Sequence, residues 1–192
     1  EPQASTWAQA LTQAGVPAQA LPLIAITEPP HPEEVTRLWR ELAAPDASAV
    51  TPTAAAPTAA APLAPRALMF VSPAAVEGFF RLRPEGCVWP RDTLAAAPGP
   101  GTAHVLLQSG AAAGLRAEHI VSPAADAEQF DSENLWPLLA PLDWRGRRVG
   151  IVSGGDASGA RGRTWLSERW REAGASVDAV QAYQRGPGHW TA

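Results

Sequence analysis

The chain has 192 residues, of which 46% are hydrophobic, and it carries a formal net charge of -4 at pH 7. This length and hydrophobic content suffice for one large domain, or one and a half ordinary ones, with a sizeable core. The acidic balance argues against binding to a nucleic-acid backbone, and no apolar run approaches the roughly 20 residues that a membrane span requires.

Cysteine, histidine and the first residues indicate a soluble protein without structural metal. Cys87 is the single cysteine and the 4 histidines are scattered, so we expect no internal disulfide and no metal site. The first residues, Glu1-Pro2-Gln3, have neither the basic start nor the apolar stretch of a signal peptide. We therefore expect a cytoplasmic protein.

The first third of the chain predicts two helices and one strand. Residues 3–14 suit a helix that stops at Gly15, and residues 21–26 predict a short buried strand. A second helix begins at Pro32 and carries on one face Val35, Leu38, Trp39 and Leu42. Residues 43–65, almost entirely Ala, Pro and Thr, predict a linker.

Strands then alternate with helices through the rest of the chain. The predicted strands are residues 67–71, 94–97, 119–121, 148–152 and 176–183, and the first four are each followed by a helical segment. Such alternation is typical of a parallel sheet with helices on both faces. Most of the 8 tryptophans are expected to pack in or around the core.

The turns that follow the strands are the first places to look for a site, because ligands of such sheets bind beyond the carboxyl ends of the strands. Ser72 is expected to cap a helix whose first residue is Pro73, which leaves backbone N–H groups free around Ala74 and Ala75. Thr102 is expected to cap the next helix and to hold an anion there. Plain helix capping is the alternative for the first turn, and glycine that serves only the turn geometry is the alternative for the second.

Two further features are open to more than one interpretation. Residues 154–163 are rich in glycine, but they have no Gly-Lys-Ser/Thr and no dinucleotide spacing, so nucleotide binding is a weak hypothesis. Tyr183 ends the last predicted strand, where packing is a commoner role than catalysis. No Ser-His-acid arrangement and no pair of carboxylates is evident.

An ordered set of short segments spans nearly the whole chain: residues 3–15, 21–26, Phe70-Val71-Ser72-Pro73-Ala74-Ala75-Val76, Gly99-Pro100-Gly101-Thr102-Ala103, Asp131-Ser132-Glu133-Asn134-Leu135, 149–155, Gly162-Arg163, Leu166 and 174–185. In this order the segments resemble the uroporphyrinogen-III synthase family, which cyclises hydroxymethylbilane in haem and related tetrapyrrole synthesis.

The resemblance implies an α/β fold of two flavodoxin-like domains, each a parallel sheet with helices on both faces, joined by a two-stranded connection. It assigns residues 1–27 to part of the first domain, 28–66 to a connection with a helix and the linker, 67–183 to the second domain and 184–192 to the return connection. One strand with one helix cannot bury its apolar face. We therefore expect these residues to be a piece of a longer chain, inactive alone, with residues 1–27 poorly ordered or packed against a neighbouring copy.

The resemblance also implies a reaction and a site. The protein would be a hydro-lyase that closes hydroxymethylbilane to uroporphyrinogen III, with inversion of ring D and loss of water, and without a cofactor. Tyr183 would donate a proton to the departing hydroxyl. The substrate carboxylates would contact helix starts and nearby groups at Ser72, Ala74, Thr102, Ala103, Gly155 and Arg163.

Partners and alternatives follow from the same resemblance. The partner would be the linear tetrapyrrole, with a transient contact to the preceding pathway enzyme. A noncatalytic synthase-like module, which binds a tetrapyrrole or docks a partner, is the main alternative. A flavodoxin-like nucleotide binder is another, and a yellow flavin in the purified protein would reveal it.

Overall fold

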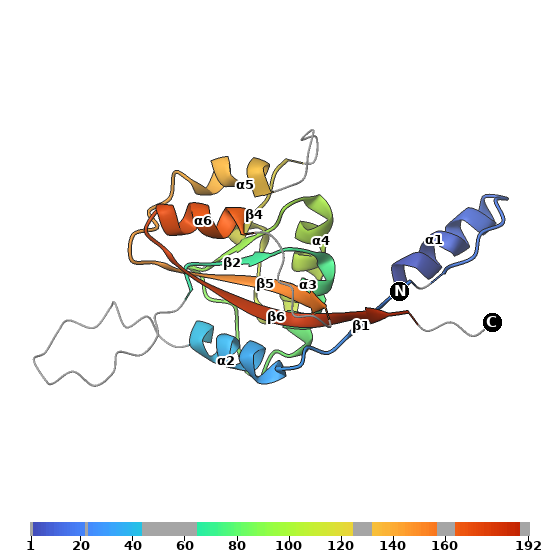
Figure 1. Ribbon diagram of the computed structural model, residues 1–192, viewed down its shortest axis with the longest axis horizontal. Helices are drawn as coiled ribbons and strands as arrows, with labels where there is room; N and C mark the ends of the chain where they lie inside the picture. Colours follow the sequence, from blue (N-terminus) through green and yellow to red (C-terminus); the bar gives the residue numbers. More distant parts are fainter. Residues whose placement is uncertain (1, 22, 44–64, 125–131, 157–163, 189–192) are drawn as a thin grey trace, which may run out of the picture.

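The computed structural model describes residues 2–21, 23–43, 65–124, 132–156 and 164–188. Within these residues six strands form one sheet in the order β1-β6-β5-β2-β3-β4 (Figure 1). Their bounds are β1 Ile24–Thr27, β2 Ala67–Phe70, β3 Leu94–Ala96, β4 Ile120–Val121, β5 Arg148–Asp156 and β6 Ser176–Pro187. Strands β2 to β6 are parallel, which confirms the predicted sheet, and β1 pairs antiparallel with β6. The predicted linker lies almost wholly outside the described residues.

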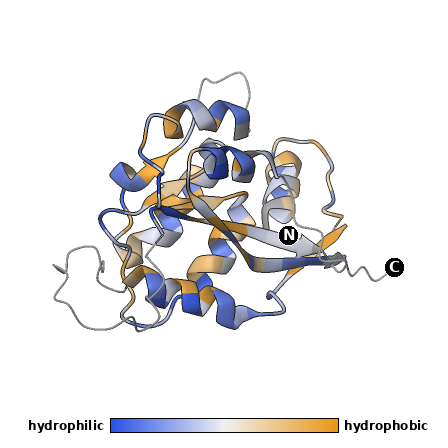
Figure 2. Ribbon diagram, turned by 60° about the vertical axis from the view of Figure 1, so that its left-hand side comes forward, coloured by the Kyte–Doolittle hydropathy of each residue, from blue (hydrophilic) through white to orange (hydrophobic). Residues whose placement is uncertain are grey.

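Helices cover both faces of the sheet, as the sequence predicts. One face carries α2 (Pro32–Ala43), α3 (Pro73–Arg81) and α4 (Pro100–Gly110), and the other carries α5 (Ser132–Leu139) and α6 (Trp165–Glu172). The 3₁₀ helices Ala111–Ala113 and Ala117–His119 lie between α4 and β4. Hydrophilic and hydrophobic residues alternate along the helices, as expected when one side of each helix is buried (Figure 2).

Helix α2 and an aromatic cluster form the core of the first face. Val35, Leu38, Trp39 and Leu42 are buried, as their helical spacing predicts. The Trp39 ring stacks on Phe79 with centroids 4.6 Å apart, and its Nε1–H donates to the Phe79 carbonyl at 3.0 Å. This places Trp39 among the tryptophans that serve packing, as predicted.

Arg148 ties α2 to the start of β6. Its guanidinium donates to Glu41 on α2 and to Asp178 on β6, each at 2.6 Å. Burial lowers the pKa of Arg148, but the hydrogen bonds to Asp178 and Glu41 outweigh that effect and hold the pKa above its ordinary value. Arg148 therefore remains charged and joins the two elements through two ion pairs.

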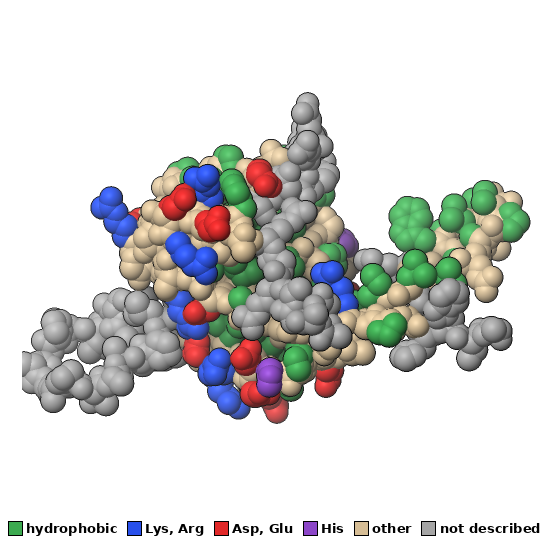
Figure 3. Space-filling view, in the orientation of Figure 1, with side chains coloured by type: hydrophobic (Ala, Val, Ile, Leu, Met, Phe, Trp, Pro, Cys, Tyr) green, Lys and Arg blue, Asp and Glu red, His purple; other side chains and the backbone are tan. Residues whose placement is uncertain are grey.

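The prediction of a buried strand near the N-terminus was wrong. The strand β1 forms, but Ile24 is 52% and Ile26 is 42% exposed. Strand β1 is the edge of the sheet and has β6 as its one neighbour. Helix α1 (Pro2–Gln13) extends away from the other helices (Figure 1), and hydrophobic side chains lie open on it (Figure 3). Trp7 on this helix is 69% exposed. An apolar run is therefore not sufficient to predict burial.

Strands β5 and β6 run further than their sequences predict. Strand β5 continues past Val152 to Asp156, and β6 continues past Tyr183 to Pro187. The predicted ends were wrong because Gly154 and Gly155, interpreted as a loop, lie in the sheet against the Tyr183 and Gln181 side chains. Beyond the register shift at Ser153/Gly154, β6 pairs both with β5 and, from Gln184 on, with β1.

Gly78 lets α3 lie directly on β6, and replacing it is expected to destabilise the fold. A Cβ at Gly78 would overlap the Ala182 carbonyl oxygen, whereas a Cβ at Gly101 in α4 would meet nothing within 4 Å. Gly78→Ala should therefore lower the free energy of unfolding by about 1–3 kcal/mol, even after the gain in helix propensity. Urea titration monitored by circular dichroism measures this, with Gly101→Ala as control. Equal midpoints for the two variants would contradict the close contact.

Candidate functional site

The strand order reverses between β2 and β5, which makes their carboxyl ends the expected place for a ligand. Strand β2 leads into α3 on one face, and β5 precedes α6 on the other. Phe70 at the end of β2 pairs with Val152, and β5 continues beyond that point. In open α/β sheets, ligands bind in the crevice at such a switch point.

Ser72, Tyr183 and Arg185 meet at this edge. The Ser72 hydroxyl lies 3.3 Å from the Tyr183 hydroxyl. The Arg185 guanidinium donates to the Tyr183 oxygen at 3.3 Å and lies over its ring, 5.7 Å from the centroid. Because a guanidinium can only donate, the Tyr183 oxygen accepts this bond and its own proton stays available for donation. The arrangement is a phenol held between a hydroxyl and a cation.

Gly154 determines where the Tyr183 ring lies. Tyr183 is 3% exposed, and a Cβ at Gly154 would overlap its ring atoms Cζ, Cε1 and Cε2. Only a residue without a side chain fits against the ring at this position of β5. The ring is therefore fixed by packing, and Arg185 and Ser72 fix the hydroxyl at its end.

The start of α3 confirms the predicted cap. Ser72 is the N-cap, Pro73 follows it, and the Ser72 hydroxyl accepts the Ala75 N–H at 3.3 Å. The expectation that the Ala75 N–H is free was therefore wrong. The N–H of Ala74 has no acceptor within the helix, because the first turn provides none. Ala74 stays a candidate donor to an anion.

The start of α4 differs from the prediction. The N-cap is Gly99 rather than Thr102, because Pro100 is the first residue of the helix, and Gly99 makes no side-chain cap. Thr102 is buried inside the first turn. The Ala103 N–H already donates to the Gly99 carbonyl at 3.1 Å, so the donor that remains at a predicted position is the Thr102 N–H.

The two remaining predicted contacts have different outcomes. Gly155 lies within β5, paired with Gln184, so the expectation of a helix-start N–H at this residue was wrong. Arg163 lies outside the described residues. Among the described residues, no group of three or more His, Cys, Asp or Glu is placed to hold a metal ion.

Arg185 is the functional candidate that the sequence reasoning missed. Its guanidinium donates a hydrogen bond to the Tyr183 hydroxyl. The signal was present in the sequence, because residues two apart on a strand lie on the same face. The strand was predicted to end at Tyr183, so Arg185 fell outside the predicted strand.

Comparison with known proteins gives a family and a fold. A family model described as Uroporphyrinogen-III synthase HemD matches residues 55–190, more than two thirds of the chain. Among solved structures, a mutant uroporphyrinogen III synthase from the extremely thermophilic bacterium Thermus thermophilus matches with a TM-score of 0.56 and 18% identity. The match covers 97% of this chain and 60% of that synthase, and at this identity it shows the fold alone. No curated protein sequence matches the chain. In the described part of the chain, no helix is long and apolar enough to cross a membrane.

Proposed function

The chain belongs to the uroporphyrinogen-III synthase family, and from that premise we propose that the protein cyclises hydroxymethylbilane to uroporphyrinogen III. The reaction inverts ring D and releases water. The terminal hydroxyl departs as water and leaves an azafulvenium-like cation. The substituted carbon of ring D attacks this cation and forms a spiro intermediate. The spiro intermediate then fragments and recloses as the asymmetric isomer.

The observation that carries this proposal is the position of Tyr183 between Ser72 and Arg185 at the switch point. Departure of hydroxide requires a proton, and a phenol whose oxygen accepts from Arg185 keeps its own proton for donation. The rest of the catalysis is the folding of the substrate into one geometry, which needs no nucleophile.

Substrate carboxylates have matching donors at this edge of the sheet. Arg185 supplies a charge, and the first turns of α3 and α4 supply N–H groups at Ala74 and Thr102, where the helix dipole favours an anion. Because Arg185 covers the Tyr183 ring, a carboxylate that binds the guanidinium would draw it off the phenol and open the hydroxyl to substrate.

The domain division is part of the same proposal. Residues 67–183 would form the second domain, with residues 1–27 in the first domain and residues 184–192 returning to it. The antiparallel pairing of β1 with the end of β6 supports this, because it places two segments from opposite ends of the chain side by side (Figure 1). The substrate would then lie between the domains, over the carboxyl ends of β2 and β5.

The test is incubation of the full-length protein with hydroxymethylbilane, followed by oxidation and chromatographic separation of the isomers. We expect isomer III in excess over the symmetric isomer that forms spontaneously. Binding of the tetrapyrrole without any excess of isomer III would contradict the proposed catalytic function and support a noncatalytic binding module.

Arg185→Gln is expected to weaken substrate binding more than it slows the chemistry. It removes one charge-assisted contact while Tyr183 and Ser72 remain, so KM should rise about 10- to 100-fold with a smaller change in kcat. Steady-state kinetics measure this, with Arg145→Gln as a control, because Arg145 is exposed on the turn before β5. Equal KM values for the two variants would exclude Arg185 from binding.

A further inference from the structure

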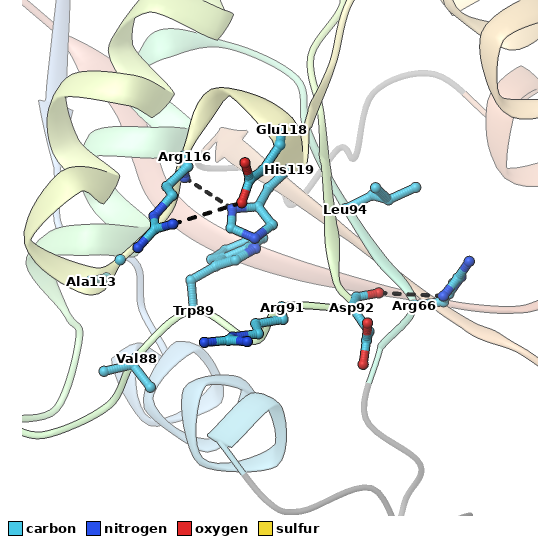
Figure 4. A pocket seen from close by; sticks show the side chains of 11 residues that line it. Arg66, Val88, Trp89, Arg91, Asp92, Leu94, Ala113, Arg116, Glu118 and His119 are labelled. Carbon is cyan, nitrogen blue, oxygen red and sulfur yellow. Dashed lines mark hydrogen bonds and ion pairs between the residues drawn. The ribbon is translucent and has the colours of Figure 1, made fainter.

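A cavity of about 510 Å³ opens at the amino ends of the strands, where β2 and β3 begin. Its wall includes Arg66, Trp89, Arg91, Arg116 and His119 (Figure 4). Ligand pockets in proteins have volumes of about 300–1,000 Å³. The site proposed above lies at the carboxyl ends of the strands, around Tyr183. None of its residues lines this cavity.

Arg66 has an unsatisfied donor in this wall. Its Nε is buried and has no hydrogen-bond partner in the described part of the chain. Its Nη1 donates to the Asp92 carbonyl at 3.5 Å, the limit for a hydrogen bond. A buried unsatisfied donor on a charged group is costly, so the described residues satisfy this guanidinium incompletely.

The other two guanidinium groups are also incompletely neutralised. Among the described residues Arg91 makes no ion pair, and Arg116 reaches Glu118 only at 4.0 Å with both side chains well exposed. Asp92 is the second carboxylate of the wall, so three cations face two acids. An exposed pair at that distance contributes little and is easily exchanged for another anion.

His119 adds a donor. It is 6% exposed, and its Nδ1 accepts the backbone N–H of Arg116 at 2.9 Å. That bond assigns the proton of the neutral ring to Nε2, so the free nitrogen of this ring donates. Figure 4 shows His119 beside Trp89, with Arg91 and Arg116 on the two sides of that side chain.

A second cavity, beside α2, contains an arginine that is fully paired. It has a volume of about 480 Å³ and contains Arg148, which Glu41 and Asp178 neutralise at 2.6 Å each. Its most buried cation is therefore paired within the fold on two sides. The cavity at Arg66 and Arg91 lacks such pairs.

We propose that the cavity lined by Arg66, Arg91, Arg116 and His119 is a second anion-binding site, which takes a small molecule through a phosphate or carboxylate group. Guanidinium groups form paired hydrogen bonds with the oxygens of both anions. Arg66 and His119 complete the polar part of the wall. The site is independent of the proposed reaction, because it lies at the amino ends of the strands and Tyr183 lies at the carboxyl ends.

The test is isothermal titration calorimetry of the 192-residue chain with sodium phosphate and, separately, with sodium citrate at low ionic strength. The Arg185→Gln variant serves as the parent protein, so that the Tyr183 edge does not contribute. We expect saturable binding of at least one anion at one site per chain. Adding Arg91→Gln should raise its Kd about tenfold or more, whereas Arg145→Gln should leave it within about twofold.

Arg66→Gln is a second test, with circular dichroism to check folding. This variant should weaken the binding of the same anion. Arg91 is exposed, so its variant keeps the proposal testable if the Arg66 variant does not fold. Phosphate binding alone would identify a phosphate-bearing ligand, and citrate binding alone a carboxylate-bearing one. Absence of saturation with both anions, or equal weakening by Arg91→Gln and Arg145→Gln, would overturn the proposal.

Discussion

Tyr183→Phe is expected to lower kcat by about 10²–10⁴-fold, the range for loss of one acid-base group. The variant removes the proton that we assign to the departing hydroxyl and leaves the aromatic ring in place against Gly154. The measurement is the initial rate of isomer III formation by the full-length protein at saturating hydroxymethylbilane.

Stability separates this effect from misfolding. Phenylalanine loses two contacts of the phenol oxygen: the bond with the Ser72 hydroxyl is worth about 0.5–1.5 kcal/mol and the bond from charged Arg185 about 1.5–3 kcal/mol. The free energy of unfolding should therefore fall by a few kcal/mol at most, and circular dichroism should still show a folded protein at the temperature of the assay, while the rate falls steeply. An unchanged kcat would remove Tyr183 from the mechanism.

Gly154→Ala is expected to lower kcat by about 10²-fold or more without altering any group that contacts substrate. The new methyl group would occupy the space of the Tyr183 ring, so the ring and its hydroxyl must move. Displacement of a reacting group by about 1 Å is enough for a loss of this size. Gly186→Ala is the matched control, because a Cβ there meets nothing within 4 Å.

A double variant tests whether Gly154 acts through Tyr183. If its role is to place the phenol, then Gly154→Ala should lower kcat little further in a Tyr183→Phe background, because the phenol is already absent. The rates of the two single variants and the double variant decide this. Independent, multiplying losses would show that Gly154 affects catalysis by another route.

The sequence predicted the parts of the fold that local patterns encode. The helix that begins at Pro32 was predicted from its apolar spacing and its acidic first turn, and it is present as α2. Ser72 was predicted as a cap from the Ser-Pro order. A proline at the first position of a helix also marks Gly99 as the next cap, because Pro100 follows it. The prediction of Thr102 as the cap was therefore wrong.

The arrangement of the site depends on contacts between distant residues and could not be predicted as fully. Glycines at 154 and 155 have the composition of a loop, and the side chains packed against the strand, Tyr183 at Gly154 and Gln181 at Gly155, explain them. The exposure of Ile24 likewise depends on what lies beside β1, which its own residues do not encode. Arg185 was within reach of sequence reasoning through its two-residue spacing from Tyr183.

The most direct test of the proposed function is the isomer III fraction of the uroporphyrinogen formed, as full-length protein is added to a fixed amount of hydroxymethylbilane. An enzyme competes with spontaneous closure, so the fraction should rise with protein concentration until isomer III is nearly the whole product. The Tyr183→Phe protein should need a higher protein concentration to reach the same fraction of isomer III. A product that stays the symmetric isomer at every concentration would contradict the account.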